Sequence, residues 1–356
     1  MNYKKFTLLA VFLFILFIAF HLITWYSLSK NIFGLQEKES IGDLARLSYR
    51  PEISKKKSLE YSLPKSHIYK ETFHNQDLDL ITIGDSFSYG GGYGKNPYYQ
   101  DFLASKYNIN ILNLGTHNMS EYIEAIVSLH NTNFFQKHKT KYLLFETVNR
   151  LSTARITHQI DWDRKNSTIL RIRPKYPYHQ DISIISNANY KMAYYYTLHH
   201  LLHQNFSNGI YKFLLTKDLF TPVGNEMLIY YSDIDTAPSY NATNIALMNK
   251  NLNKLAKMLK EDGVTLIFMP VVDKYDLYYD YIKGNTYPKN NFFKLFQNVK
   301  KDYLYINTKA ILLPLIQKGE KDIFYLDDTH WSYKASDAIT NSRVFKDIFS
   351  GRLNAL

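Results

Sequence analysis

The stretch that decides the fold reads Leu78-Asp79-Leu80-Ile81-Thr82-Ile83-Gly84-Asp85-Ser86-Phe87-Ser88. Its first part is an apolar run typical of a buried strand, and Gly84 opens a tight turn directly after it. In a parallel α/β sheet, ligands bind outside the carboxyl ends of the strands, and a sharp turn there lifts a side chain clear of the sheet. We therefore expect Ser86 to be an exposed nucleophile at that edge.

A second motif, Asp327-Asp328-Thr329-His330-Trp331-Ser332, lies about 240 residues downstream. It supplies a carboxylate and an imidazole, the two groups that turn a weakly reactive serine into an attacking one. In this interpretation His330 takes the proton of Ser86, and an acidic neighbour orients the imidazole. The two motifs together indicate acyl-transfer chemistry, whereas a copy that kept the fold and lost the reaction is the alternative.

Strand-like and helix-like segments alternate between and after these motifs. Such alternation is typical of a parallel sheet with helices on both of its faces. The expected strands are 78–83, 109–114, 142–145, 264–269 and 303–306, and the expected helices are 97–106, 121–130, 244–259, 310–317 and 334–348. His330 then falls in the loop before the last helix.

The two motifs resemble those of the SGNH (GDSL-type) hydrolase superfamily, whose first block is Gly-Asp-Ser and whose last block supplies Asp and His. The wording Asp328-Thr329-His330-Trp331 is similar to the branch that contains the alginate O-acetyltransferase proteins. The resemblance implies a three-layer, flavodoxin-like α/β fold. The superfamily's usual acid lies three residues before the histidine, at Asp327, and that of the acetyltransferase branch lies two before it, at Asp328. We prefer Asp328 and keep Asp327 as the rival.

The resemblance also suggests an oxyanion hole, because a tetrahedral intermediate needs donors aimed at its negative oxygen. Its expected members are the backbone of Ser86, Gly115 from the second block, and Asn149, for which a structural role is the alternative. We further expect substrate contacts from four residues beside these motifs or at the same sheet edge: Asp85, Arg150, Lys274 and Trp331. For Lys274 a solvated loop charge is the alternative, and for Arg150 the alternative is a pairing with Glu146.

The segment from Phe6 to Leu28 is almost entirely apolar and is long enough to cross a bilayer. We predict a transmembrane anchor at residues 1–29, since the run is long for a signal peptide and ends in Trp25 and Tyr26, which are typical of membrane interfaces. A lead-in covers 30–76 and the catalytic domain covers 77–356. An inserted subdomain is expected at about 150–240, where the alternation breaks down.

The composition gives less specific information. The chain has 356 residues, a net charge of +11 and no cysteine. The positive charge would attract acidic polymers, although a generally lysine-rich composition explains it equally well. We expect no metal, cofactor or nucleic acid: the glycine run 90–94 lacks the residues of a phosphate loop, and His199, His200 and His203 lack the glutamate of a metalloprotease helix.

These observations favour a membrane-anchored O-acyltransferase, with its catalytic domain on the outer (periplasmic) side of the cytoplasmic membrane, acting on an envelope or secreted glycan. By resemblance to the alginate system, a multi-spanning acyltransferase partner would supply the acyl groups. The N-terminal helix would contact membrane lipid. An esterase with the same three residues, or a catalytically inactive glycan-binding scaffold, is the alternative.

Overall fold

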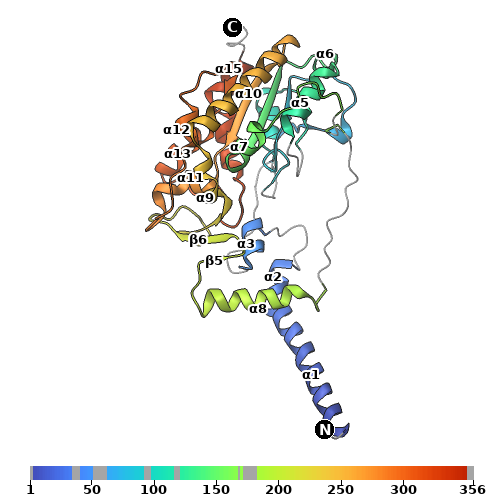
Figure 1. Cartoon of the computed structure of the whole chain (residues 1–356), viewed down its shortest axis with the longest axis vertical. Helices are drawn as coiled ribbons and strands as arrows, with labels where there is room; N and C mark the ends of the chain where they lie inside the picture. The colour runs from blue at the N-terminus through green and yellow to red at the C-terminus, as the bar shows by residue number, and fades with distance from the viewer. Residues whose placement is uncertain are drawn as a thin grey trace.

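The computed structural model describes residues 3–33, 41–50, 62–91, 98–115, 121–166, 169–170 and 183–350 (Figure 1). Its centre is a six-stranded sheet in the order β1-β3-β2-β4-β8-β9, and every neighbouring pair is parallel. The strands are β1 (Ile68–Tyr69), β2 (Leu80–Ile83), β3 (Ile111–Asn113), β4 (Tyr142–Val148), β8 (Thr265–Val271) and β9 (Leu304–Tyr305). All four residues of β2 are buried, as the apolar run predicts.

Helices cover both faces of this sheet, so the predicted three-layer α/β fold is confirmed. One face carries α5 (Tyr122–Asn131), α7 (Asn149–Thr157) and α10 (Ala242–Glu261), and the other carries α4 (Tyr99–Tyr107), α13 (Thr308–Gln317) and α14 (Tyr333–Thr340). Helices lie on both faces because the crossovers between parallel strands are right-handed and change direction at β2. The chain first passes from β2 to β3 on one side, and it then crosses back to β4 on the other side.

Helix α10 shows how the sequence specifies one of these elements. Its buried residues recur with helical spacing and include Ile245, Met248 and Leu252. The Asn241 side chain caps the first turn by accepting the N–H of Asn244 at 2.9 Å. Gly263, with a φ of 74°, ends the helix in the left-handed conformation that glycine adopts without strain.

The closing helix expected at 334–348 is two helices, α14 and α15 (Arg343–Phe349). Ser342 adopts an extended conformation with a ψ of 158°, which breaks the helical path between them. The apolar spacing continues across the break, with Ile339 and Phe345 both buried, and this continuity made the pattern look like one helix.

Two regions outside the main sheet differ from the sequence interpretation. The sheet begins with β1, inside the stretch expected to be a lead-in, and α3 (Asp43–Ser48) from the same stretch packs against β6 and β7. Between α7 and α10 the chain forms α8 (Asn187–His200) and an antiparallel sheet of β5 (Phe206–Ser207), β6 (Ile210–Leu214) and β7 (Glu226–Tyr230). An insertion was expected here, but its strands were not.

The remaining helices are short, apart from the N-terminal one. They are α2 (Lys30–Phe33), α6 (Phe134–Lys137), α9 (Ser232–Asp235), α11 (Lys274–Tyr278) and α12 (Phe292–Phe296). Helix α1 (Tyr3–Thr24) continues through a π-helical turn, η1 (Trp25–Ser29), and projects away from the domain (Figure 1). Among the described residues, Tyr3–Ser29 is the one helix long and apolar enough to cross a membrane.

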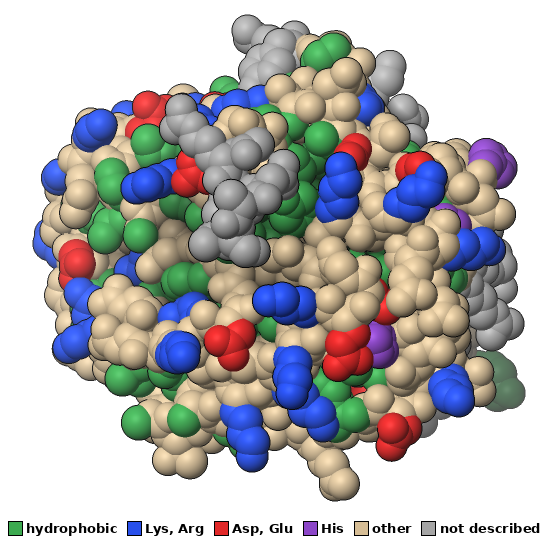
Figure 2. Space-filling model, turned by 90° about the horizontal axis from the view of Figure 1, so that it is seen from above, with side chains coloured by type: hydrophobic (Ala, Val, Ile, Leu, Met, Phe, Trp, Pro, Cys, Tyr) green, Lys and Arg blue, Asp and Glu red, His purple; other side chains and the backbone are tan. Residues whose placement is uncertain are grey.

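The end of the molecule remote from α1 has a different surface. Figure 2 shows Lys and Arg side chains spread over this face and interspersed with Asp and Glu. The positive charge of the chain is therefore not gathered there into a patch of one sign. A mixed surface of this kind is typical of a face in contact with water.

Candidate active site

The turn after β2 is built on a buried carboxylate from β4. Glu146 Oε2 accepts the backbone N–H groups of Asp85 and Ser88 at 3.0 and 3.2 Å, and the Ser88 hydroxyl at 2.8 Å. A Cβ on Gly84 would lie 2.2 Å from that same oxygen, which explains the glycine. Burial first, and the Asp85 carboxylate second, raise the pKa of Glu146 well above its usual range. From the sequence, Glu146 was expected only as an alternative partner of Arg150, which the structure instead pairs with Asp233.

Asp85 was expected to contact substrate, but the structure gives it an internal role. It is 5% exposed, and its carboxylate accepts the N–H groups of Phe87 and Val148 and pairs with Arg155 at 2.5 Å. Although burial opposes the charge, the Arg155 guanidinium and the Val148 N–H lower the pKa of Asp85. The aspartate thus joins the nucleophile turn to the end of β4, and its oxygens are occupied within the protein.

The structure brings Ser86, His330 and Asp328 into one hydrogen-bonded chain, although Ser86 and His330 are 244 positions apart. The Ser86 Oγ lies 2.7 Å from His330 Nε2, and His330 Nδ1 lies 2.6 Å from Asp328 Oδ1. Asp328 is fully buried, His330 is 8% exposed and Ser86 is half-buried. A buried acid, an oriented imidazole and a reachable hydroxyl are the arrangement that a serine nucleophile requires.

Asp327, the rival acid, points elsewhere. Its Oδ2 accepts the N–H of Gly42 at 2.8 Å, and its carbonyl accepts the N–H of Ala45 at 3.1 Å. The structure therefore places Asp328, and not Asp327, against the imidazole. Only the backbone path of the loop could separate two adjacent aspartates in this way.

Lys274 was expected at the substrate, and the structure instead places it beneath the loop that carries His330. Its side chain is 1% exposed, and Nζ donates to the carbonyl oxygens of Tyr325, Leu326 and Asp328 at 2.6, 2.7 and 3.1 Å. Three carbonyls that converge on one ammonium fix the course of the loop. Neither a substrate contact nor a solvated charge describes this residue.

A further residue of the site comes from α3 and was missed in the sequence analysis. Asp43 accepts the backbone N–H of Thr329 at 2.8 Å and its hydroxyl at 2.6 Å, and the Asp43 N–H donates to Asp328 Oδ2 at 3.3 Å. Burial first, and the Asp328 carboxylate second, raise the pKa of Asp43. Nothing in the local sequence signals this contact, because it joins segments 286 positions apart.

The approach to the imidazole is shaped by Gly91. A Cβ at this position would lie 2.2 Å from His330 Nε2. The turn itself is tethered, because the Gly91 N–H donates to the Ser86 carbonyl at 2.6 Å and the Tyr89 N–H donates to the Asp85 carbonyl at 3.0 Å. The glycine is thus required by space, and it leaves room for the hydrogen bond between His330 and Ser86.

The expected oxyanion donors differ in their placement. The N–H of Gly115 donates to the Asn113 side chain at 2.8 Å, and Asn149 is fully buried with its amide 3.4 Å from Asp273. Both donors therefore point into internal contacts. Within the described parts of the chain, no acceptor engages the backbone N–H of Ser86.

Two other expected substrate residues are also internal. Arg150 pairs with the buried Asp233 at 3.1 Å and lies over the ring of Tyr230. Trp331 is 3% exposed and packs edge-on against Phe87, with ring centroids 4.8 Å apart. Trp331 thus supports the residues around Ser86 from beneath and does not offer a surface to substrate.

Asp43, Asp328 and His330 also have the composition of a cation site, since their ligand atoms lie within 4.8 Å of one another. Both Asp43 oxygens already accept hydrogen bonds from Thr329, and His330 is bonded to Asp328. A cation bound by all three would have to break the contact that orients the imidazole. The donor set therefore fits the hydrogen-bonded triad better than it fits a metal.

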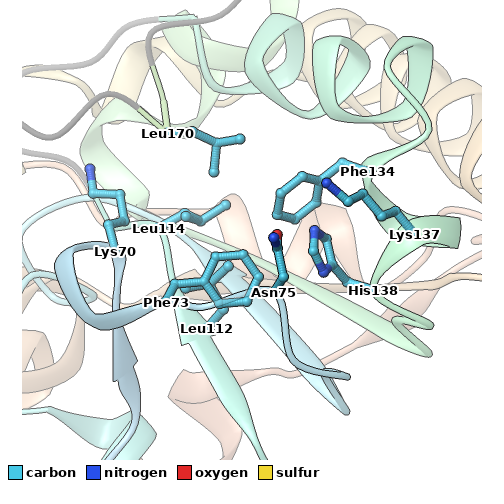
Figure 3. A pocket seen from close by; sticks show the side chains of 9 residues that line it. All are labelled: Lys70, Phe73, Asn75, Leu112, Leu114, Phe134, Lys137, His138 and Leu170. Atoms are coloured by element: carbon cyan, nitrogen blue, oxygen red, sulfur yellow. The ribbon is translucent and has the colours of Figure 1, made fainter.

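A pocket of about 320 Å³ lies on the β3 side of the sheet, and neither Ser86 nor His330 lines it (Figure 3). Its walls include the apolar side chains of Phe73, Leu112 and Leu114. Figure 3 shows Lys70 and Lys137 on opposite sides of it. We assign this pocket no part in the chemistry of the serine.

The parallel three-layer fold, with a serine after β2 and an Asp-x-His loop before the closing helices, is consistent with an α/β domain of the SGNH hydrolase type. Residues 223–342 match the family described as the SGNH hydrolase-like domain of the acetyltransferase AlgX. This match, over 120 of the chain's 356 residues, supports the SGNH-type, alginate O-acetyltransferase-like branch that the motifs resemble. The matched segment includes Asp328 and His330 and begins after Ser86. No curated protein sequence matches the chain significantly.

Proposed function

We propose that this protein is a membrane-anchored O-acyltransferase that acetylates a polysaccharide through a covalent intermediate on Ser86. The observation that carries the proposal is the chain of 2.7 and 2.6 Å contacts from Ser86 through His330 to Asp328. The match to an acetyltransferase domain favours transfer to a glycan hydroxyl over release to water.

In the first half-reaction the Ser86 Oγ attacks the carbonyl carbon of an acetyl donor, and His330 Nε2 takes the hydroxyl proton. Asp328 accepts the Nδ1–H of His330, which keeps Nε2 free to act as the base and stabilises the imidazolium. The tetrahedral intermediate collapses, His330 returns the proton to the leaving group, and an acetyl ester remains on Ser86.

In the second half-reaction a sugar hydroxyl gives its proton to His330 Nε2 and attacks the acetyl ester. The acetylated glycan leaves as Ser86 recovers its proton. In both steps the backbone N–H of Ser86 is the proposed oxyanion donor, because no described group occupies it. Gly115 and Asn149 would have to leave their internal partners before they could add a second donor.

Helix α1 is the proposed anchor. Before its contact with α8, most of its apolar side chains are exposed, and Leu8 and Phe14 are 70% and 65% exposed. A stripe of such length is unfavourable in water and favourable in hydrocarbon. The catalytic domain would then lie outside the cytoplasmic membrane, where exported glycans are modified. One spanning helix cannot itself carry acetyl groups across a bilayer, so a multi-spanning acyltransferase partner is proposed to deliver them.

The proposal is tested with the full-length chain in lipid nanodiscs and a chromogenic acetyl ester, with and without a deacetylated uronic acid polymer. We expect ester cleavage to fall by at least about 10³-fold in Ser86→Ala. The matched control is Ser350→Ala, an exposed serine at the end of α15, which should keep full activity.

The products separate the possible functions. Acetyl groups on the polymer, and an acetylated Ser86 peptide in the absence of polymer, support transfer. Free acetate as the sole product would indicate an esterase. Cleavage that is unchanged by Ser86→Ala would refute the catalytic role of the serine and leave a binding scaffold.

A further inference from the structure

Helix α8 runs across the domain-side end of α1, as Figure 1 shows, and hydrogen bonds of one buried side chain join the two segments. Asn189 of α8 is fully buried: its Nδ2 lies 2.9 Å from His21 Nδ1, and its Oδ1 accepts the Ser29 hydroxyl at 2.7 Å. A buried amide with both ends bonded fixes the two helices in one relative position.

Tyr190 marks the side of α8 that faces the N-terminal part of α1, which we call the underside of α8. Its ring stacks on Phe20 at 5.0 Å and meets the edge of His21 at 5.1 Å. His21 precedes Trp25 by four residues, which at 1.5 Å per residue places this contact about 6 Å further into the apolar helix than Trp25. The underside of α8 therefore lies level with residues that a bilayer would cover.

The same underside carries a row of exposed, uncharged side chains. Tyr190, Tyr194, Thr197 and Leu201 follow the spacing i, i+4, i+7 and i+11, which places them on one helical face. Tyr194 is 60% exposed and Leu201 is 71% exposed. Moreover, residues 183–217 contain no Asp or Glu, so no acidic side chain of this segment would oppose an anionic headgroup.

The opposite side of α8 is attached to the catalytic domain through α3. His199 Nδ1 lies 2.8 Å from the buried Arg50 guanidinium, and its Nε2 lies 3.1 Å from the Ser48 carbonyl. Tyr195 stacks on Tyr49, with ring centroids 5.0 Å apart. One face of the helix thus packs on protein, and the other is uncovered beside α1.

We infer that α8 is an interfacial helix, whose Tyr190–Leu201 face lies in the headgroup and upper acyl region of the bilayer. This inference rests on the proposed anchoring by α1. The depth of about 6 Å below Trp25 agrees with the depth of about 5–10 Å at which amphipathic surface helices are immersed. Tyrosine suits this zone, because its ring is apolar and its hydroxyl remains hydrated.

This placement gives α8 a specific task. Through His199 and Tyr195 the helix holds α3, and through Asp43 α3 holds the loop of Asp328 and His330. The membrane surface would therefore set the orientation of the triad, and the site would stand at a fixed height above the lipid. Such a height determines how far an acyl donor must emerge from the bilayer.

The test uses the full-length chain, which has no cysteine, so that single cysteines label uniquely. Variants Tyr194→Cys and Thr197→Cys on α8, Leu13→Cys on α1 and Leu247→Cys on α10 each receive an environment-sensitive fluorophore. The chain is reconstituted without partners in vesicles of phosphatidylcholine and phosphatidylglycerol. Quenching by a nitroxide near the top of the acyl chain is compared with quenching by aqueous iodide.

We expect the labels at 194 and 197 to be quenched by the lipid nitroxide and shielded from iodide about fivefold relative to that at 247, since a surface helix is shielded by headgroups. The label at position 13 should show a lipid environment whichever result the α8 labels give. Iodide quenching at 194 and 197 equal to that at 247, with 13 still in lipid, would overturn the inference and leave the anchor intact. An aqueous label at 13 would refute the anchoring and this inference with it.

Discussion

Gly91→Ala provides the most direct test of the catalytic geometry, because it adds one methyl group where the structure has no room for it. The new Cβ would lie 2.2 Å from His330 Nε2, whereas ordinary contacts begin at 3.4 Å. The turn cannot easily withdraw, since the Gly91 N–H is bonded to the Ser86 carbonyl at 2.6 Å. The imidazole must therefore move by about 1 Å, the difference between these two contact distances.

The magnitude follows from this displacement. The hydrogen bond of 2.7 Å between Ser86 and His330 would stretch beyond the normal range, or the contact of 2.6 Å between His330 and Asp328 would break. Misplacement of a reacting group by about 1 Å costs on the order of 10²-fold, and complete loss of a general base costs about 10²–10⁴-fold. We expect kcat for acetyl ester cleavage to fall by at least about 10²-fold, which corresponds to about 2.7 kcal/mol.

The assay is ester cleavage by the full-length chain, measured beside its thermal unfolding temperature. The matched control is Gly263→Ala, at a position with a φ of 74° and no atom within 4 Å of the added Cβ. This control should lose about 1–2 kcal/mol of folding stability through backbone strain and keep full kcat at a temperature where it is folded. Gly91→Ala should instead lose kcat and keep most of its folding stability.

A Gly91→Ala protein with kcat within about threefold of the parent would refute the reasoning, because a displacement of 1 Å could not leave a working base so little affected. His330 would then not lie against this turn during catalysis. Equal losses of activity and stability in both glycine variants would equally count against a specific effect at the site.

Two further predictions concern carboxylates of the site. Asp328→Asn should lower kcat by about 10⁴-fold, since an amide holds the imidazole in the wrong tautomer, whereas Asp327→Asn should cost less than about tenfold, since it weakens one hydrogen bond; comparable losses would contradict the assignment of the acid. Glu146→Gln should change the pH dependence of stability. The pKa of Glu146 is raised on folding, so the folded state loses stability as pH rises from the ordinary value of 4.5 through the folded pKa. The unfolding temperature of the variant should therefore increase relative to that of the parent as pH rises. A difference in unfolding temperature that stays constant across pH would contradict the raised pKa.

Those parts of the fold that depend on local pattern could be predicted from the sequence. The apolar run at 78–83 and the helical stripe of α10 lie where their periodicities indicate, because burial of one face or of a whole strand leaves a local signature. The antiparallel sheet β5–β7 left no such signature: its strands are two to five residues long, β5 and β6 mix exposed with buried positions, and β7 has a run of only three buried residues. The expected closing helix was wrong in length, because one extended residue, Ser342, breaks a continuous apolar pattern.

The sequence by itself determined the chemical groups of this protein: the serine after a buried strand, the Asp-x-His motif, and an N-terminal helix long and apolar enough to cross a membrane. It did so because each is a property of a few neighbouring residues. Only the tertiary structure decided which groups meet. It turned Asp328 and not Asp327 toward His330, directed Asp85 and Lys274 inward, and brought Asp43 to Thr329. Contacts between residues tens to hundreds of positions apart depend on how the layers pack, and no short stretch of sequence encodes that packing.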